Sequence, residues 1–196
     1  MTKSVKSLVL ITIVSLFFNA AHAQLRLPSI NGVGNDVKKV IEDYPNRFIN
    51  LMGEVVNENA QSTDYQCNFK VNGAEAAIVT RYSAKKEVCS WEALMLSTEN
   101  FEKARQKFKS LFGQLNNLSV NVGSNKNFHL KGKYEAPAEE NKFTTVVFSF
   151  DPETGATEKL KVELSLQYHA PMEWKVKVLV YDKEREDDER GNTKEG

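Results

Sequence analysis

Apolar side chains recur at helical spacing in two stretches of the chain. The first stretch begins after Asp36, and its apolar positions are Val37, Val40, Ile41, Tyr44, Phe48, Leu51, Met52 and Val55. This spacing predicts an amphipathic helix over residues 36–55. Pro45 interrupts the pattern. Because proline removes a backbone hydrogen bond and clashes with the preceding turn, we expect a kink or a restart near Tyr44.

A second helical stretch follows Ser97 and Thr98, which are candidate N-terminal caps. Its apolar stripe consists of Phe101, Ala104, Phe108, Leu111, Phe112, Leu115 and Leu118. Polar and charged residues occupy the positions between them. The pattern therefore predicts a second amphipathic helix with one buried and one solvated face.

The remaining stretches alternate between apolar and polar residues with the period of a half-buried strand. We predict seven strands, at about residues 65–71, 76–82, 88–96, 126–134, 142–150, 158–169 and 173–181. Asn72-Gly73 is a common two-residue hairpin turn between the first two strands. Because each helix must bury its single apolar stripe, we expect both helices to pack on one face of a mostly antiparallel sheet, in a two-layer α+β sandwich.

An internal similarity suggests a duplication. Residues 48–55 (FINLMGEV) align with residues 108–115 (FKSLFGQL) at an offset of 60. The chain then consists of a helix followed by three strands, written twice over 36–97 and 98–181, with one extra strand. Shared helical periodicity is the alternative explanation. In element order alone the layout resembles secreted proteins of the β-lactamase-inhibitor type, which present a curved sheet to a partner, although no motif of that family is present.

The N-terminus has the features of a secretory signal peptide. Lys3 and Lys6 precede an apolar run from Leu8 to Phe18, and Ala21-His22-Ala23 forms a small-x-small cleavage site. The run is shorter than the roughly 20 apolar residues that a transmembrane helix needs, and no later segment approaches that length. We therefore predict cleavage after Ala23 and a secreted or periplasmic protein without a membrane span in the mature chain.

The mature chain is expected to contain one domain flanked by two irregular segments. Residues 24–35 contain proline, two glycines and several polar residues, which is typical of a flexible leader. The domain follows over 36–181 as a single α+β unit. Residues 182–196 hold seven acidic and four basic residues and no large apolar residue, and therefore predict a disordered charged tail.

The charge balance argues against a nucleic-acid partner. The whole chain has 26 basic and 26 acidic residues, and loss of residues 1–23 removes Lys3 and Lys6 but no acid, which leaves a net charge of −2. Proteins that bind nucleic acid through a broadly cationic surface need an excess of basic residues to displace counterions from phosphates.

Cys67 and Cys89 are an even pair in a protein that is expected to be exported, and this favours a disulfide between them. Two buried thiols are the alternative. In a simple meander the two cysteines would lie two strand spacings apart, about 9.6 Å, whereas a disulfide needs Cα atoms within about 7 Å. The bond therefore requires adjacent strands or a curled sheet.

The sequence contains no motif for a catalytic nucleophile, a metal or a bound phosphate, so we predict no catalytic residues, no metal site and no cofactor. His129 and His169, the two histidines of the mature chain, both alternate out of phase with their apolar neighbours and fall on the face away from the helices. A solvated surface histidine is the simplest interpretation of each.

One face of the sheet combines basic and apolar residues and is our candidate binding face. Its residues are His129, Lys131, Lys133, Phe148, Lys161, Lys175, Lys177 and Tyr181. An exposed apolar patch with a charged rim is typical of a binding surface; alternatively, a loop or the leader covers it and the lysines keep sheet edges soluble. We predict an exported, non-enzymatic binding protein whose partner is an unknown protein.

Two other functions remain open at this stage. One is an extracytoplasmic hydrolase whose site forms only in three dimensions, with His129 or His169 as the base. The other is a carrier of a small apolar ligand held between sheet and helices.

Overall fold

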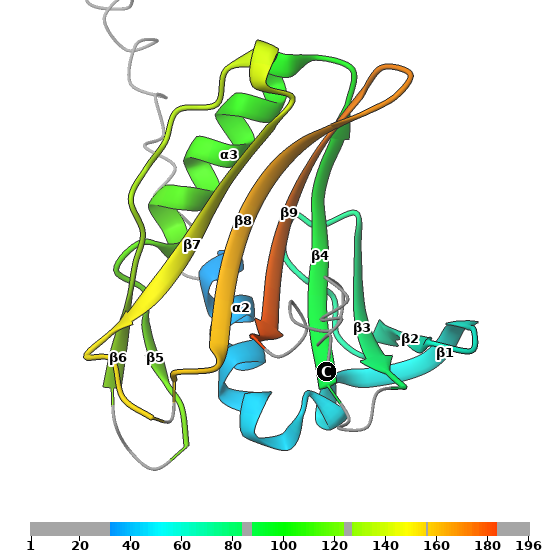
Figure 1. Cartoon of the computed structure of the whole chain (residues 1–196), viewed down its shortest axis with the longest axis vertical. Coiled ribbons are helices and arrows are strands. Elements are labelled where there is room, and N and C mark those ends of the chain that lie inside the picture. Colours follow the sequence, from blue (N-terminus) through cyan, green and yellow to red (C-terminus); the bar gives the residue numbers. More distant parts are fainter. Residues whose placement is uncertain (1–31, 84–87, 124–126, 156, 184–196) are drawn as a thin grey trace, which may run out of the picture. The chain divides into compact units, whose positions relative to one another are not determined.

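We describe the protein from a computed structural model, which covers residues 32–83, 88–123, 127–155 and 157–183. The predicted signal peptide, residues 24–31 of the predicted leader and the tail from Glu184 lie outside the described residues. Within these ranges the chain forms an open antiparallel sheet of nine strands and two α-helices (Figure 1). The predicted α+β class is confirmed.

The first half of the domain contains one helix and four strands. In chain order these are α2 (Val33–Asp43), the short 3₁₀ turns η1 (Tyr44–Asn46) and η2 (Ile49–Leu51), β1 (Met52–Glu58), β2 (Ser62–Cys67), β3 (Ala76–Tyr82) and β4 (Val88–Thr98). The second half contains α3 (Phe101–Leu115), β5 (Ser119–Asn121), β6 (Asn127–Lys131), the 3₁₀ turn η3 (Glu139–Asn141), β7 (Phe143–Asp151), β8 (Leu160–His169) and β9 (Glu173–Asp182).

The strands lie in the order β1-β2-β3-β4-β9-β8-β7-β6-β5, so the last strand of the chain joins the two halves in the middle of the sheet. Two strands were not predicted. β1 is exposed along nearly its whole length and shows no alternation in burial, and β5 is only three residues long. Four strands follow α2, where the predicted repeat has three. The internal repeat itself stays a prediction.

The first helix is shorter than the apolar pattern predicts. It begins three residues before the predicted start and ends at Asp43. The carboxylate of Asp43 accepts hydrogen bonds from the side-chain amides of Asn46 (2.8 Å) and Asn50 (2.7 Å). Arg47 and Phe48 adopt left-handed backbone conformations with φ of 55° and 57°. The chain therefore reverses through η1 and η2 and enters β1 instead of restarting a helix after Pro45.

The second helix lies where the sequence predicts it, but its cap is different. α3 begins at Phe101, and the side-chain oxygen of Asn100 accepts a hydrogen bond from the backbone N–H of Lys103 at 2.9 Å. Such a bond satisfies one of the amide groups that a helix leaves unpaired in its first turn. The predicted caps Ser97 and Thr98 belong to the end of β4.

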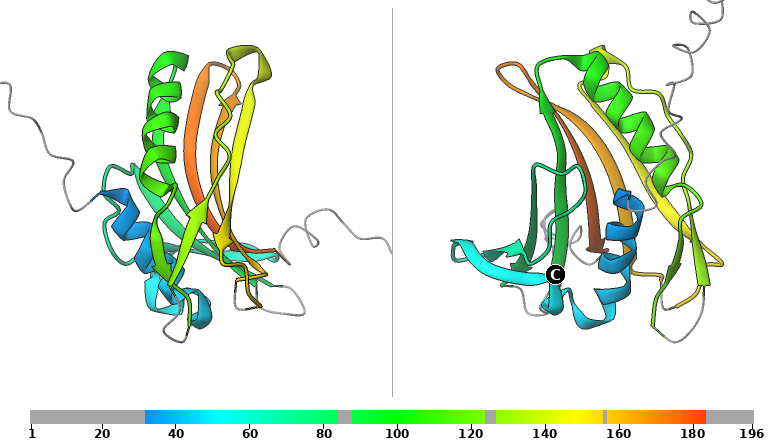
Figure 2. Two further views of the ribbon diagram at one scale, coloured as in Figure 1. Left: turned by 90° about the vertical axis from the view of Figure 1, so that its left-hand side faces the viewer. Right: turned by 180° about the vertical axis from the view of Figure 1, so that it is seen from behind.

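The core lies between the helices and one face of the sheet, which we call the inner face. Its completely buried side chains include Val37, Val40 and Ile41 of α2, Ala104, Phe108 and Leu115 of α3, and Leu160, Val162, Leu164, Val176, Val178 and Val180 of β8 and β9. Both helices lie on the same side of these strands (Figure 2, left). The arrangement is thus sandwich-like, with one helical layer and one sheet layer.

The connection between β2 and β3 is longer than the predicted two-residue turn, and it is hydrogen-bonded to both helices. The backbone and side-chain N–H groups of Asn72 each donate to Asp36 of α2 at 2.8 Å. Lys107 of α3 donates to the carbonyl of Gly73 at 3.2 Å, and Gly73 has the positive φ of 68° that glycine adopts readily. Burial lowers the pKa of Lys107, and the charge of Glu75 opposes this shift.

Cys67 and Cys89 are not joined by a disulfide. β2, β3 and β4 form the simple meander, with Gln66 opposite Ile78 and Cys89 opposite Arg81, three residues farther along β3. The cysteines are therefore about 9.6 Å apart across the sheet and further separated along it, beyond the roughly 7 Å between Cα atoms that a disulfide allows. The predicted disulfide is wrong. Both side chains are buried, with exposures of 7% and 6%.

Candidate interaction surface

The side of the sheet that faces away from the helices, which we call the outer face, is built from rows of side chains that cross several strands. One row consists of Ile78, Glu92, Leu179, Glu163 and Val147, which lie opposite one another across β3, β4, β9, β8 and β7. Apolar and acidic residues alternate along it.

Three further rows complete the outer face. They are Leu94–Lys177–Ser165–Thr145, Ser97–Lys175–Gln167–Phe143 and Ser90–Tyr181–Lys161. Lys177 and Lys161 therefore lie in the two rows directly beside the row that contains Glu92 and Glu163, and Lys175 lies one row farther along β9.

Two lysines of the outer face form ion pairs with acidic residues of the same face. Lys177 lies 2.8 Å from Glu92, and Lys175 lies 3.0 Å from Glu173. The hydroxyl of Tyr181 donates to Glu163 at 3.0 Å. The Lys177 and Glu92 side chains are only 27% and 26% exposed. The face predicted from basic and apolar residues therefore also contains acidic residues, two of which pair with Lys175 and Lys177.

Glu173 is the acidic residue whose ionisation the outer face changes most clearly. A hydrogen bond from the Ser97 hydroxyl and another from Lys175 lower the pKa of Glu173 below its ordinary value of 4.5. The positive charge of Lys175 and the nearby His169 act in the same direction, and desolvation opposes them. His169 lies opposite Glu173 in the β8–β9 register, and its Nε2 atom has no hydrogen-bond partner among the described residues.

Exposed apolar side chains gather at the β7 side of the outer face. Phe143 is 48% exposed and Val147 is 47% exposed, and both project from the same face of β7 with Thr145 between them. Isolated exposed apolar residues are common on proteins, but two on one strand beside neutralised charges form a local apolar surface.

The predicted binding-face residues of β8 and β9 lie where the sequence places them, and the one on β7 does not. Lys161, Lys175, Lys177 and Tyr181 lie on the outer face, although Tyr181 is only 4% exposed. Phe148 is completely buried on the inner face, where its ring centroid lies 5.8 Å from that of Phe112 in α3.

The error at Phe148 has a simple cause. The segment 143–150 reads FTTVVFSF, so both faces of this strand carry apolar residues and threonine. Its alternation therefore does not say which face is buried, and an error of one residue moves every side chain to the opposite face. The inner side of β7 consists of Thr144, Val146, Phe148 and Phe150.

The remaining predicted residues lie on or after β6, at the far side of β7. His129 and Lys131 are exposed on β6, and Lys133 is exposed in the segment that follows it. The ammonium group of Lys131 donates to the side-chain oxygen of Asn117. These residues therefore form the margin of the outer face rather than its centre.

The structure does not bring the two histidines together. His129 lies opposite Asp151, at one end of β7, whereas His169 lies two residues beyond Gln167, which is opposite Phe143 at the other end. Eight residues of an extended strand separate these two positions, which corresponds to about 27 Å. The two imidazoles do not share a site. The hydrolase alternative stays a prediction.

Sequence reasoning missed the acidic partners of the lysines. Glu92, Glu163 and Glu173 have the same alternation phase as the outer-face lysines, so the sequence could have placed them on this face. The pairing of Glu92 with Lys177 could not be predicted, because the two residues meet only when β9 is inserted beside β4, 85 residues away in sequence.

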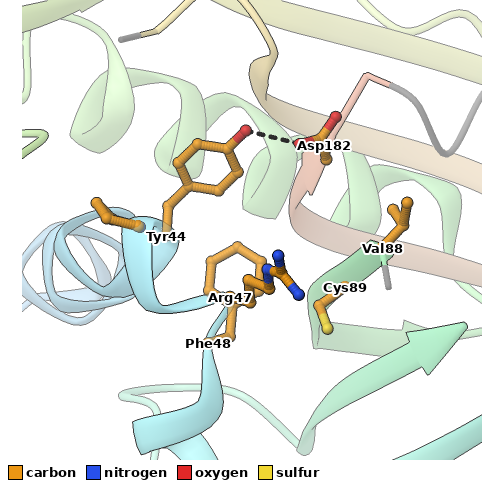
Figure 3. A pocket seen from close by; sticks show the side chains of 7 residues that line it. Tyr44, Arg47, Phe48, Val88, Cys89 and Asp182 are labelled. Atoms are coloured by element: carbon orange, nitrogen blue, oxygen red, sulfur yellow. Dashed lines mark hydrogen bonds between the residues drawn. The ribbon is translucent and has the colours of Figure 1, made fainter. Parts of the chain in front are cut away.

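A cavity of about 220 Å³ opens where η1 meets the end of the sheet (Figure 3). Tyr44, Arg47, Cys89 and Asp182 contribute to its wall, and the Tyr44 hydroxyl donates to Asp182 at 2.8 Å. This bond connects the turn after α2 to the last strand. The volume is below the roughly 300–1,000 Å³ that is usual for small-molecule sites.

Two larger depressions, of about 400 and 560 Å³, lie along the β2–β3 connection and beside α2. The apolar inner-face side chains of β7 and β8 line none of these three sites, that is, neither the two depressions nor the cavity at η1. The carrier alternative therefore stays a prediction.

Among the described residues, no group of three or more His, Cys, Asp and Glu side chains is arranged to hold a metal ion. Neither α2 nor α3, the helices in the described ranges, has the length and apolar character that a membrane span requires. No protein-family model, curated protein or solved structure matches the chain.

Proposed function

We propose that this protein is an exported, non-enzymatic interaction protein that binds a partner protein through the outer face of its sheet. The observation that carries this proposal is the asymmetry of the sheet. Both helices pack on the inner face, and the outer face of β3, β4, β9, β8 and β7 remains uncovered by them. A broad surface on hydrogen-bonded strands whose inner side chains are packed in the core is suited to a preorganised interface.

The chemistry of the outer face favours a protein partner with a mainly apolar surface. Because Lys177 and Glu92 already pair with each other, they need no opposite charges from the partner. Apolar residues such as Leu179 and Val147 alternate with these charges and supply the area that association removes from water. Binding of this kind depends less on ionic strength than binding through unpaired lysines.

The substitution Leu179→Lys tests the proposal with little risk to the fold. Leu179 lies at the centre of the outer face between Glu92 and Glu163, so an added lysine would have acidic neighbours on both sides. We expect the variant to lose the partner that the unsubstituted protein captures from the exported fraction of its host. Quantitative mass spectrometry of the captured proteins gives the measurement.

Val55→Lys is the matched control, because Val55 is 53% exposed on β1, away from the outer-face rows. This variant should capture the same partner as the unsubstituted protein. If Leu179→Lys retains the partner, or if both variants lose it equally, the outer face is not the binding surface. Circular dichroism and thermal unfolding of both variants show whether each is folded.

The proposed export has a separate test. When the chain is expressed with its own N-terminus, the exported protein should begin at Gln24, as measured by intact mass. Substitution of Ala23 by a large residue, Ala23→Phe, should block this cleavage, because the peptidase recognises small side chains at that position. A protein that keeps residues 1–23 and stays inside the cell contradicts the proposal.

A further inference from the structure

The sheet has two edges with unpaired backbone groups, and these edges differ in their protection against pairing with another strand. β1 is the first strand of the sheet, and its pairing with β2 is interrupted by register shifts between Met52 and Val55 and between Val55 and Asn57. It also carries Glu54 and Glu58, both exposed. Bulges and charges are the usual devices by which proteins prevent an edge from pairing with another strand.

The second edge lies along β7, because β6 covers only part of that strand. β6 pairs with β7 at Ser149–Asp151 and leaves the sheet after Lys131. The backbone N–H of the next residue, Gly132, donates to the side chain of Asn116 instead. In the described part of the chain, residues 143–148 therefore pair with β8 on one side and with no strand on the other.

Figure 2 (left) looks toward this edge and shows the segment after β6 between α3 and β7, on the inner side of the strand. This agrees with the close approach of Gly132 to the buried ring of Phe148. The segment packs onto the helix layer instead of continuing the sheet, and Tyr134 within it contacts the rings of Phe108 and Phe112.

The edge formed by residues 143–148 has none of the protection seen at β1. Its sequence, FTTVVF, contains no charge, no glycine and no proline, and its register with β8 is continuous. All six residues have high β-propensity. A regular, uncharged and partly apolar edge of this kind is a template for another strand.

We propose that this edge pairs with the same edge of a second copy of the chain, in antiparallel orientation. Opposite residues must lie on the same face of the joined sheet, so a two-fold axis at Thr145 places Phe143 of one copy opposite Val147 of the other. Aromatic and β-branched residues in this relation form favourable cross-strand pairs. The two exposed apolar side chains of each copy thus cover those of the other.

The extent and the charge of the edge both agree with a second copy as the occupant. The paired segment, 143–147 in each copy, ends just before Ser149, where β6 begins to occupy the edge. Because the segment carries no charge, two identical copies meet without repulsion between like charges, whereas pairing through β1 would bring its glutamates together. A two-fold contact of this kind is closed and gives a dimer rather than a fibre.

The inference does not depend on the proposed function, although Val147 belongs to both surfaces. The two tests stay distinguishable because Leu179 lies two strands away from this edge. Five-residue strands bury less than the total of about 1,200–2,000 Å² that stable interfaces usually bury. We therefore expect a weak dimer that sedimentation-velocity experiments detect as a rise in mean mass with protein concentration.

A mixing experiment tests the register as well as the association. Phe143→Lys and Val147→Glu should each weaken the dimer at least tenfold, because each homodimer places a charged residue opposite an apolar one twice. Mixing the two variants should restore association to within a few-fold of the unsubstituted protein, since the mixed dimer contains one Lys–Glu pair and one Phe–Val pair.

Crosslinking gives an independent readout. Directly opposite residues of an antiparallel pair have Cα atoms about 4.5–5.5 Å apart, so Thr145→Cys at the two-fold axis should form a disulfide between copies on mild oxidation. Val55→Cys on β1 is the control and should remain uncrosslinked.

A protein that stays monomeric up to millimolar concentration overturns the proposal. So does a dimer that Val55→Lys disrupts and Phe143→Lys does not, which would place the contact on β1. A mixture of the two β7 variants that associates no better than either alone contradicts the register. Folding of each variant is checked by circular dichroism at low concentration.

Discussion

The two faces of β8 and β9 share one backbone but contain different chemistry. On the inner face, Leu164 and Val178 lie opposite each other and are completely buried against the helix layer. On the outer face, one residue away along each strand, Ser165 lies opposite Lys177, whose side chain is 27% exposed and paired with Glu92. Burial of apolar area stabilises the fold far more than a partly exposed ion pair does.

This difference implies a division between the two faces of each strand, one of which contributes far more to stability than the other. The inner side chains determine whether the protein folds, because every lost methyl group leaves a cavity in a packed layer. The exposed outer side chains, such as Phe143 and Val147, should contribute less to stability. Substitutions on opposite faces of the same strand should show this division directly.

The largest difference is expected within β7. Phe148→Ala removes a completely buried ring and should lower the free energy of unfolding by about 3–5 kcal/mol. Phe143→Ala on the outer face, where the ring is 48% exposed, should cost less than about 1 kcal/mol. Urea denaturation at a protein concentration that keeps the chain monomeric measures both. Equal losses would contradict the division between the faces.

Two glycines, one packed against the inner face of β7 and one with open space around it, test how tightly the inner face is packed. A Cβ atom on Gly132 would lie 2.8 Å from the Phe148 ring and 2.9 Å from Val146, so Gly132→Ala should destabilise the fold by about 1–3 kcal/mol through overpacking.

Gly113→Ala in α3 is the matched control, since no atom beyond its chain neighbours and the local helix backbone lies within 4 Å of the added Cβ. This substitution should stabilise the protein by up to about 1 kcal/mol, because alanine favours the helix. Thermal unfolding of the two variants should therefore shift in opposite directions. A downward shift for both would show that space at the added Cβ does not decide the outcome.

On the outer face, the Lys177–Glu92 pair should contribute only a small coupling. A double-mutant cycle with Lys177→Met and Glu92→Gln is expected to give about 0.2–1 kcal/mol, since both side chains are about a quarter exposed. The coupling should decrease in high salt. A coupling above about 3 kcal/mol, unaffected by salt, would mean that this pair belongs to the structural part of the sheet.

The smallest effect concerns pH. The pKa of Glu173 is lowered by hydrogen bonds from Ser97 and Lys175, so the folded state favours the ionised carboxylate. Its contribution to stability is therefore complete above the ordinary value of 4.5 and is lost as pH falls through the lower, folded-state pKa.

We expect the stability difference between the unsubstituted protein and Glu173→Gln to shrink as pH falls from neutrality to below 4.5. Ser97→Ala removes the strongest donor and should make this dependence weaker. Urea denaturation over a pH series provides the measurement. A difference that grows toward acid pH would show that the sign of the pKa shift is wrong.

Local pattern was sufficient for much of the fold. The stripe around Phe108 predicted α3, and the alternation from Leu160 to Tyr168 predicted β8, because in both cases one period spans a long segment with a clear apolar side. The same pattern failed beyond Asp43, where side-chain hydrogen bonds to the carboxylate turn the chain despite a continuing helical period. It also failed at β7, whose two faces are similar in composition.

The candidate surface was only partly accessible to sequence reasoning. Lys175 and Lys177 could be assigned to the outer face from their alternation with Trp174 and Val176. The pairing of Lys177 with Glu92 could not be predicted, because these two residues lie far apart in the chain.

By itself, the sequence determined the second helix, most of the strands and the need of both helices for an apolar sheet to cover them, because periodicity is a local property. Only the tertiary structure decided that β9 joins the two halves, that Cys67 and Cys89 stay apart and that β6 leaves part of β7 unpaired. These features depend on strand order and register, which result from contacts between residues that are distant in the chain.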